Sequence, residues 1–142
     1  MKVSARNQLK GKISNIVVGS VNNEVEITLE SGDKLTTVIT KQSSDSLELS
    51  IGKVAYAIIK APWVVLADPT CQLKFSARNQ LAGTIKKFTK GAVNSNVVVE
   101  TDKGLSIISV ITNESLEEMD ISEGKAINAI VKASSIILAI DE

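Results

Sequence analysis

The sequence predicts an all-β protein made of two tandem, OB-like five-stranded barrels, each with one short helix. Three observations support this fold class. The hexapeptide Ser-Ala-Arg-Asn-Gln-Leu occurs at residues 4–9 and again at 76–81, where each copy opens a longer repeat. Within each copy, short stretches rich in valine, isoleucine and threonine alternate apolar and polar residues, as strands do. Glycines separate these stretches, as expected at the turns between strands.

The repeat covers nearly the whole chain. Shifting the sequence by 72 positions aligns residues 4–69 with 76–141 without a gap. Two copies of one sequence pattern predict two copies of one fold. The join falls near Pro69, where proline interrupts strand pairing and turn-forming residues cluster. We therefore expect one domain at residues 1–69 and a second at 70–142.

Each copy is expected to contain five strands, which in the first copy cover residues 10–18, 21–30, 34–40, 53–60 and 63–67. A polar segment, KQSSDSLELS in the first copy and NESLEEMDIS in the second, lies between the third and fourth strands. This segment predicts a short helix that packs on the sheet through Leu47 and Leu49. Thr40 and Thr112 stand at the N-cap position of the two helices. A small β-sandwich shows the same alternation, so the periodicity leaves that alternative open.

Composition indicates a cytoplasmic protein that assembles with copies of itself. No apolar stretch approaches the length of a membrane span, and the first residues lack the apolar core of a secretory signal. Cys71 is the only cysteine, so no internal disulfide stabilises the small domains. Apolar residues nevertheless make up 44% of the chain. Because domains of this size bury a small fraction of their surface, we expect a homo-oligomer that covers part of the apolar surface.

Charge and residue types argue against several classes of function. The 16 basic and 16 acidic residues leave no net charge, so no global field attracts nucleic acid or an anionic membrane. Histidine is absent and cysteine solitary, which removes the usual ligands of zinc and iron and the usual general base. The sequence offers no nucleophile paired with a base. We therefore predict no enzyme, no cofactor and no metal ion held directly by side chains.

The two arginines of the chain occupy equivalent positions. Arg6 and Arg78 each lie in the repeated hexapeptide, and every other basic residue is a lysine. A guanidinium presents a planar fork of donors that can hold two oxygens of an oxyanion, whereas an ammonium is a point charge. This pattern predicts one oxyanion contact per repeat. The alternative is that each arginine bridges subunits through a carboxylate.

Other hydrogen-bond donors also recur in both copies: they are Ser4 and Ser76, Ser43 and Ser115, and Lys60 and Lys132. The acidic positions that recur are few and fall in segments expected to be exposed. A site rich in donors and poor in acceptors favours a fully deprotonated dianion. Hydrogen phosphate carries an O–H that costs about 1–3 kcal/mol when it is buried without a partner. The residues therefore predict a sulfate-like or molybdate-like ligand and do not choose between the two.

Three motifs together resemble a known family. The Ser-Ala-Arg-Asn-Gln-Leu-x-Gly stretch, the Val-Ile-Thr-x-x-Ser stretch and the Lys-Ala-Pro-Trp at residues 60–63 are similar to the Mop domain of the molbindins. Tandem-domain molbindins are cytoplasmic molybdate storage or buffering proteins. The same domain is found at the C-terminal end of molybdate-responsive transcription regulators and of molybdate-transporter ATPase subunits. The resemblance implies that molybdate, and tungstate with it, binds in pockets between domains and subunits of a homotrimer.

The resemblance also implies roles for individual residues. In each copy it gives anion contacts to a serine, an arginine, a lysine and the amide after that lysine, with a further serine reaching in from a neighbouring domain. Two asparagines are implied at a second kind of site near the symmetry axis. The complete set of implied ligands is Ser4, Arg6, Asn7, Ser43, Lys60, Ala61, Ser76, Arg78, Asn79, Ser115, Lys132, Ala133 and Ser134.

The sequence departs from the family pattern at two places. The regulator form of the domain has an arginine three residues after the helix-start serine, where this chain has Ser46 and Glu118. The second copy has Ser134 where the first has Pro62, which adds a donor. We therefore expect the two copies to bind unequally.

Other functions remain to be weighed against molybdate binding: a nucleic-acid-binding OB module, a sulfate-type oxyanion binder, and a sensor or transporter subunit. An OB module for nucleic acid has a basic groove with stacking aromatic residues, but aromatic residues here total 3%. We expect neither nucleic acid nor a membrane as partner. The first motif begins at residue 4, so we expect no DNA-binding helical domain ahead of it, and no GxxxxGK[ST] loop is present.

Overall fold

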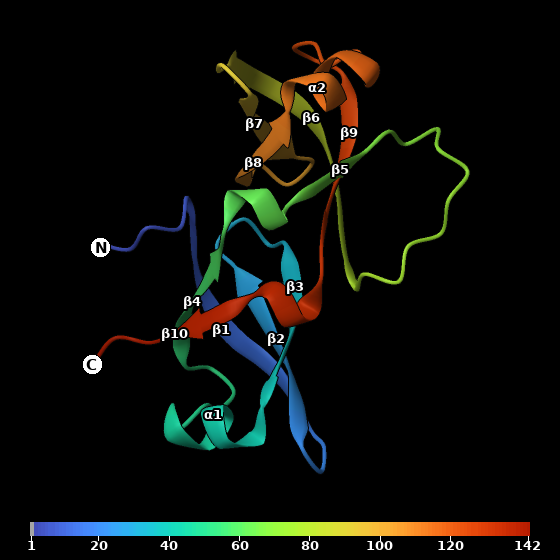
Figure 1. Ribbon diagram of the computed structural model, residues 1–142. Helices are drawn as coiled ribbons and strands as arrows, with labels where there is room; N and C mark the ends of the chain where they lie inside the picture. Colours follow the sequence, from blue (N-terminus) through green and yellow to red (C-terminus); the bar gives the residue numbers. More distant parts are fainter. Residues whose placement is uncertain (1) are drawn as a thin grey trace.

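The protein, described here by a computed structural model over residues 2–142, folds into two five-stranded antiparallel sheets with one short α-helix beside each (Figure 1). Both sheets curl, so that β10 lies against β3 in one and β5 against β8 in the other. The predicted fold class of two tandem five-stranded OB-like units is confirmed. The bounds of the elements follow.

The first half contains β1 (Asn7–Val18), β2 (Asn22–Leu29), β3 (Lys34–Thr40), α1 (Lys41–Ser46), β4 (Val54–Ile59), the 3-10 turn η1 (Ala61–Trp63) and β5 (Val65–Ala67). The second half repeats the order with β6 (Asn79–Lys90), β7 (Asn94–Thr101), β8 (Ser106–Thr112), α2 (Asn113–Glu118), β9 (Ala126–Val131), η2 (Ala133–Ser135) and β10 (Ile137–Ala139). The strands observed in the first half match the five predicted stretches to within a few residues at each end.

The last strand of each half belongs to the sheet of the other half. One sheet has the order β10-β4-β1-β2-β3 and the other has β5-β9-β6-β7-β8. Leu138 of β10 pairs with Ala57 of β4, and Leu66 of β5 pairs with Ala129 of β9. In Figure 1 the green strand β5 runs up into the upper sheet, and the red strand β10 returns to the lower one. Each sheet is thus built from both halves, and a boundary between residues 69 and 70 stays a prediction.

The two helices begin at the predicted caps. Thr40 precedes α1 and its Oγ1 accepts a hydrogen bond from the backbone N–H of Ser43, at 3.1 Å. Thr112 and Ser115 repeat this contact before α2, also at 3.1 Å. Leu47 follows α1 and packs against the core, as expected. Both helices are six residues long, and none in residues 2–142 is long and apolar enough to cross a bilayer.

Alternation of apolar residues places one face of each sheet in the core. On β2 the residues Val25, Ile27 and Leu29 are buried, while the residues between them are partly exposed. Gly11 lies where β1 crosses β2 closely, because a Cβ there would approach the carbonyl oxygen of Thr28 to 2.4 Å. The buried apolar side chains of both halves form one continuous cluster. The two halves therefore share a core as well as strands.

Candidate functional site

The predicted site residues lie where the two halves meet, at the ends of neighbouring strands. Ser4 and Arg6 precede β1, and Lys60 follows β4, its neighbour in the sheet. Asn7 of β1 pairs with Ile59 of β4, so the same register continued by one residue sets Arg6 opposite Lys60. The pairing of Asn79 with Val131 does the same for Arg78 and Lys132 in the second half. Strand register thus places one arginine and one lysine at the same end of a pair of neighbouring strands in each sheet.

Arg6 lines a hollow of about 410 Å³ between the halves. Lys86 and Lys87 of β6 and Ser106 of β8 line the same hollow from the other half. Within residues 2–142, Arg6 takes part in no ion pair, while Lys86 lies 3.6 Å from a carboxylate oxygen of Glu100. Three cationic side chains and a hydroxyl therefore surround a space large enough for a small anion.

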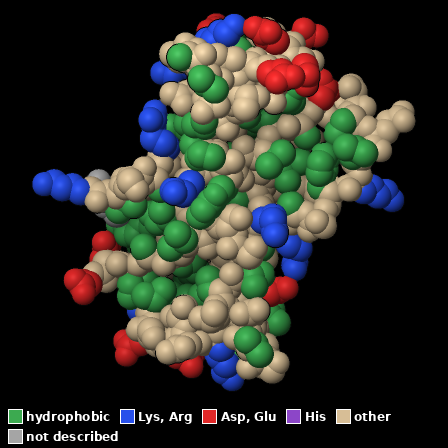
Figure 2. Space-filling model, in the orientation of Figure 1, with side chains coloured by type: hydrophobic (Ala, Val, Ile, Leu, Met, Phe, Trp, Pro, Cys, Tyr) green, Lys and Arg blue, Asp and Glu red, His purple; other side chains and the backbone are tan. Residues whose placement is uncertain are grey.

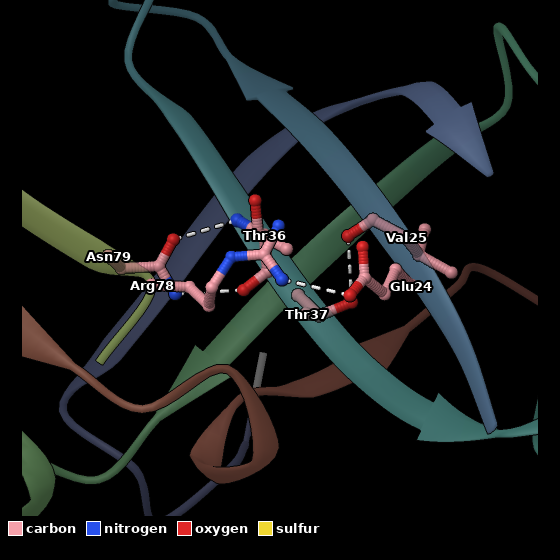
Figure 3. A network of polar contacts seen from close by, with 6 residues as sticks. All are labelled: Glu24, Val25, Thr36, Thr37, Arg78 and Asn79. Carbon is pink, nitrogen blue, oxygen red and sulfur yellow. Dashed lines mark hydrogen bonds and ion pairs between the residues drawn. The ribbon is translucent and has the colours of Figure 1, made fainter. Parts of the chain in front are cut away.

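Arg78 has a different surrounding (Figure 3). Its Nη1 donates to Oε1 of Glu24 on β2 at 2.8 Å, and both side chains are about half exposed. Arg78 is therefore paired with a carboxylate of its own chain, whereas the alternative raised from the sequence, a bridge between subunits, stays a prediction. The residue equivalent to Glu24 in the second half is Asn96. The carboxylate is therefore a feature of one half only.

Asn7 and Asn79 connect the two halves. The Oδ1 of Asn79 accepts from the N–H of Thr36 at 2.7 Å, and its Nδ2 donates to the Thr36 carbonyl at 2.8 Å (Figure 3). Asn7 makes the equivalent pair of bonds to the N–H and carbonyl of Ile108, both at 2.8 Å. Because β3 and β8 are edge strands, the side-chain amides pair with backbone groups that face no further strand.

The sequence did not lead us to predict that these two asparagines link the halves. Asn7 and Asn79 are only 2% and 4% exposed, and their amides already have partners. Asparagine is a poor strand former, yet it starts the first strand of both copies. Its presence at this position twice was the one feature of the sequence that pointed to a special structural role. A contact between either amide and an anion stays a prediction. The Nδ2 of Asn79 already donates to two carbonyls, whereas the Nδ2 of Asn7 donates to one and keeps a second N–H.

Ser76 and Lys132 share a second hollow, of about 380 Å³, with Pro62 and Trp63 of the other half. The ammonium of Lys60 lies 5.5 Å from the centre of the Trp63 ring, a cation–π contact. The position equivalent to Trp63 in the second half is Ser135, which has no ring to hold Lys132. The two lysines therefore present their charges in different surroundings.

Ser43 and Ser134 meet in a third hollow, of about 520 Å³, formed by α1 and β3 of one half with η2 and β10 of the other. Ser46, the position where the regulator form has arginine, lines it as well. The residue equivalent to Ser46 in the second half is Glu118, and the residue equivalent to Ser134 in the first half is Pro62. The third hollow therefore offers hydroxyl groups at positions where its counterpart has a carboxylate and a proline.

Ser115, Ala61 and Ala133 lie at the starts of short helical segments, and their contacts to an anion stay a prediction. Ser115 is part of the α2 cap, as Ser43 is of the α1 cap. Ala61 and Ala133 open η1 and η2 and are buried at 1% and 7% exposure. Six of the thirteen predicted ligands line three separate hollows: Arg6 and Asn7 the first, Ser76 and Lys132 the second, and Ser43 and Ser134 the third. The other seven line none of the three, so within one chain the predicted ligands do not meet at one point.

Two carboxyl groups have shifted pKa values, and neither lines these hollows. The backbone N–H and hydroxyl of Thr70, with Lys125 nearby, lower the pKa of the partly exposed Asp68. A hydrogen bond from Lys90 lowers the pKa of Glu117. Within residues 2–142, histidine, cysteine and acidic side chains form no group of three that could hold a metal ion.

Known proteins resemble the chain over its full length. The family model of the TOBE domain matches residues 3–66 and 76–138. A molybdenum transport protein ModE of Azotobacter vinelandii is 40% identical over 141 residues, which cover 99% of this chain and 52% of that protein. A probable molybdenum-pterin-binding protein of Haemophilus influenzae is 48% identical over 66 residues, which cover 46% of this chain and 96% of that protein.

A solved structure of the cytoplasmic molybdate-binding protein ModG, in a form with molybdate bound, superposes with a TM-score of 0.94. It is 43% identical, and the match covers 99% of this chain and 100% of that one. The chain spans about half the length of the ModE relative. The two TOBE matches fall on the two sequence repeats. The chain therefore belongs to the TOBE-domain family, with two copies of the domain in tandem, which confirms its resemblance to the tandem Mop-domain proteins.

Proposed function

We propose that this protein binds molybdate, and tungstate by the same chemistry, as a cytoplasmic store and buffer of molybdenum that catalyses no reaction. One observation carries the proposal: the whole chain matches the fold of molybdate-bound ModG at 43% identity. The hollows between the halves supply the chemistry that such a ligand needs. Molybdate and tungstate are tetrahedral dianions whose oxygens accept hydrogen bonds and donate none.

The donor inventory supports an anion of this kind. Arg6 and Lys87 line one hollow together with Lys86, which is paired with Glu100 at 3.6 Å, and Ser106 adds a hydroxyl donor. The fork of Arg6 can contact two oxygens of the anion at once. Hydrogen phosphate would bring an O–H into a hollow whose polar side chains are mainly donors, so it should bind less well. Sulfate has the same charge and shape and is the competitor to test.

A homotrimer in which chains complete one another's sites is part of the proposal. Ser4 and Lys60 are exposed in the single chain, where another chain could reach them. Val65 and Ile137, on the short edge strands β5 and β10, are 52% and 54% exposed. Apolar side chains on a sheet edge favour association with another chain. Assembly and anion binding should therefore be coupled.

The proposal is tested by titrating the full chain with molybdate, tungstate, sulfate and phosphate in a calorimeter, together with native mass spectrometry. We expect heat and bound mass with the first two anions, weak or no binding of phosphate, and a trimer whose stability rises with bound anion. Failure of molybdate to bind would refute the function. Equal affinity for sulfate would instead indicate a general oxyanion binder.

Replacing Arg6 by lysine is expected to weaken molybdate binding by about tenfold to hundredfold while the fold remains. The charge stays, but one of two parallel charge-assisted hydrogen bonds is lost, and each such bond contributes about 1.5–3 kcal/mol. Calorimetry measures the affinity and circular dichroism checks the fold. Lys90→Ala serves as the control, because it removes a whole charge at the far end of β6. Equal effects of the two substitutions would contradict a contact specific to the guanidinium.

A further inference from the structure

The two halves differ in charge around their equivalent arginines. Glu24 pairs with Val38 on β3, and Asn96 pairs with Val110 on β8, so residues 24 and 96 hold the same place in their sheets. Only Glu24 carries a carboxylate, and it accepts a hydrogen bond from Arg78 (Figure 3). An amide at position 96 has no charge with which to neutralise Arg6.

Neighbouring positions extend the same asymmetry. Lys86, Lys87 and Val98 line the hollow of Arg6. The residues equivalent to these three in the first half are Ser14, Asn15 and Glu26. Ser106 of the same hollow corresponds to Lys34, so the equivalent set in the first half has lost two positive charges, gained one positive charge and gained one negative charge. The first half is therefore less cationic at these positions, although Lys86 itself lies 3.6 Å from a carboxylate oxygen of Glu100. Figure 2 shows both cationic and acidic side chains on the visible face of the molecule, with a group of acidic ones near its upper end.

We propose that Glu24 sets the affinity of the Arg78 site by competing with the oxyanion for the guanidinium, so that the chain carries a tight site at Arg6 and a weak site at Arg78. The inference depends on the proposed function, since it concerns how the same anion divides between two sites. Before an anion can use the fork of Arg78, the carboxylate must leave it. Once displaced, Glu24 remains close by and repels the dianion.

The expected effect is moderate because the pair is exposed. Exposed ion pairs contribute up to about 1 kcal/mol, which corresponds to about fivefold in affinity, and repulsion from the displaced carboxylate adds to this factor. We therefore expect the two sites to differ by about five- to tenfold or more. A store with two such sites takes up and releases molybdate over a wider range of free concentration than one with identical sites.

The test exchanges the two residues in the full chain. Glu24→Asn copies the second half onto the first, and Asn96→Glu does the reverse. Calorimetric titration with molybdate should show two classes of site in the unaltered protein. Glu24→Asn should raise the affinity of the weak class by about five- to tenfold, and Asn96→Glu should lower that of the tight class by a similar factor. The double exchange should restore two unequal classes.

Controls separate competition from net charge and from folding. Glu24→Gln removes the charge with little change of shape, and should act like Glu24→Asn. Glu30→Gln removes the same charge in the turn that follows β2 and should leave both affinities within about twofold. Thermal unfolding of each variant checks the fold. If the unaltered protein binds molybdate but neither exchange changes an affinity, the role of Glu24 is refuted while the function stands. If the unaltered protein binds no molybdate, the proposed function itself fails.

Discussion

Replacing Asn79 by alanine is expected to lower the free energy of unfolding by about 2–4 kcal/mol. The side-chain amide holds three backbone groups, namely the N–H and carbonyl of Thr36 and the carbonyl of Val131. Alanine would leave these groups without their partner at a position where the asparagine is 4% exposed, and water replaces such bonds poorly. For a chain of this size, the midpoint of thermal unfolding should fall by about 7–14 °C.

Chemical denaturation followed by circular dichroism, at one protein concentration, measures this loss. Gln80→Ala is the matched control, because Gln80 is exposed and bonds only to carbonyls of the segment just before β6. It should change the free energy of unfolding by less than about 0.5 kcal/mol. Asn7→Ala removes two bonds to Ile108 and should have a smaller effect than Asn79→Ala. A stability of Asn79→Ala close to that of Gln80→Ala would contradict the role of the amide as a link between the halves.

Residues 1–70 alone are expected not to form a stable folded monomer. Their sheet would lack β10, whose Ile137, Leu138 and Ala139 pair with β4 in the full chain. Their own last strand, β5, would lack β9. Because β5 and β10 are equivalent, β5 of one copy can pair with β4 of another, and the fragment should fold only by exchanging strands between copies. Binding of molybdate by a monomeric fragment should be weak, since each hollow needs both halves.

Light scattering and circular dichroism over a wide range of concentration provide the measurement. Folded structure should appear together with the oligomer and disappear on dilution. Leu66→Lys in the same fragment should abolish both, because Leu66 is 7% exposed and lies in the exchanged strand. A folded monomer that binds molybdate tightly would refute the interpretation.

The strands and helix starts were predictable because they depend on neighbours in the sequence. Val25, Ile27 and Leu29 are spaced by two and became the buried face of β2. Thr40 and Ser43 are three residues apart and form the cap of α1. The tandem repeat implied two similar folds, and the sheets have equivalent strand orders.

The candidate site was predictable in its residue types and only partly in its arrangement. The motif and the repeated donors selected Arg6, Lys132 and Ser134, all of which line hollows between the halves. Their division among three hollows did not follow from spacing along the chain. The hydrogen bonds of Asn79 to Thr36 also join residues that no local pattern connects.

Local sequence specifies how many strands each repeat forms, where they turn and where the helices begin, because alternation and capping act over a few residues. Which sheet accepts β5 or β10, and which arginine meets a carboxylate, is decided by the folded chain. Arg78 and Glu24 are 54 positions apart, and Asn7 and Ile108 are 101 apart. Contacts over such distances arise only when the two halves have packed against each other, since packing selects among the many pairings that local sequence allows.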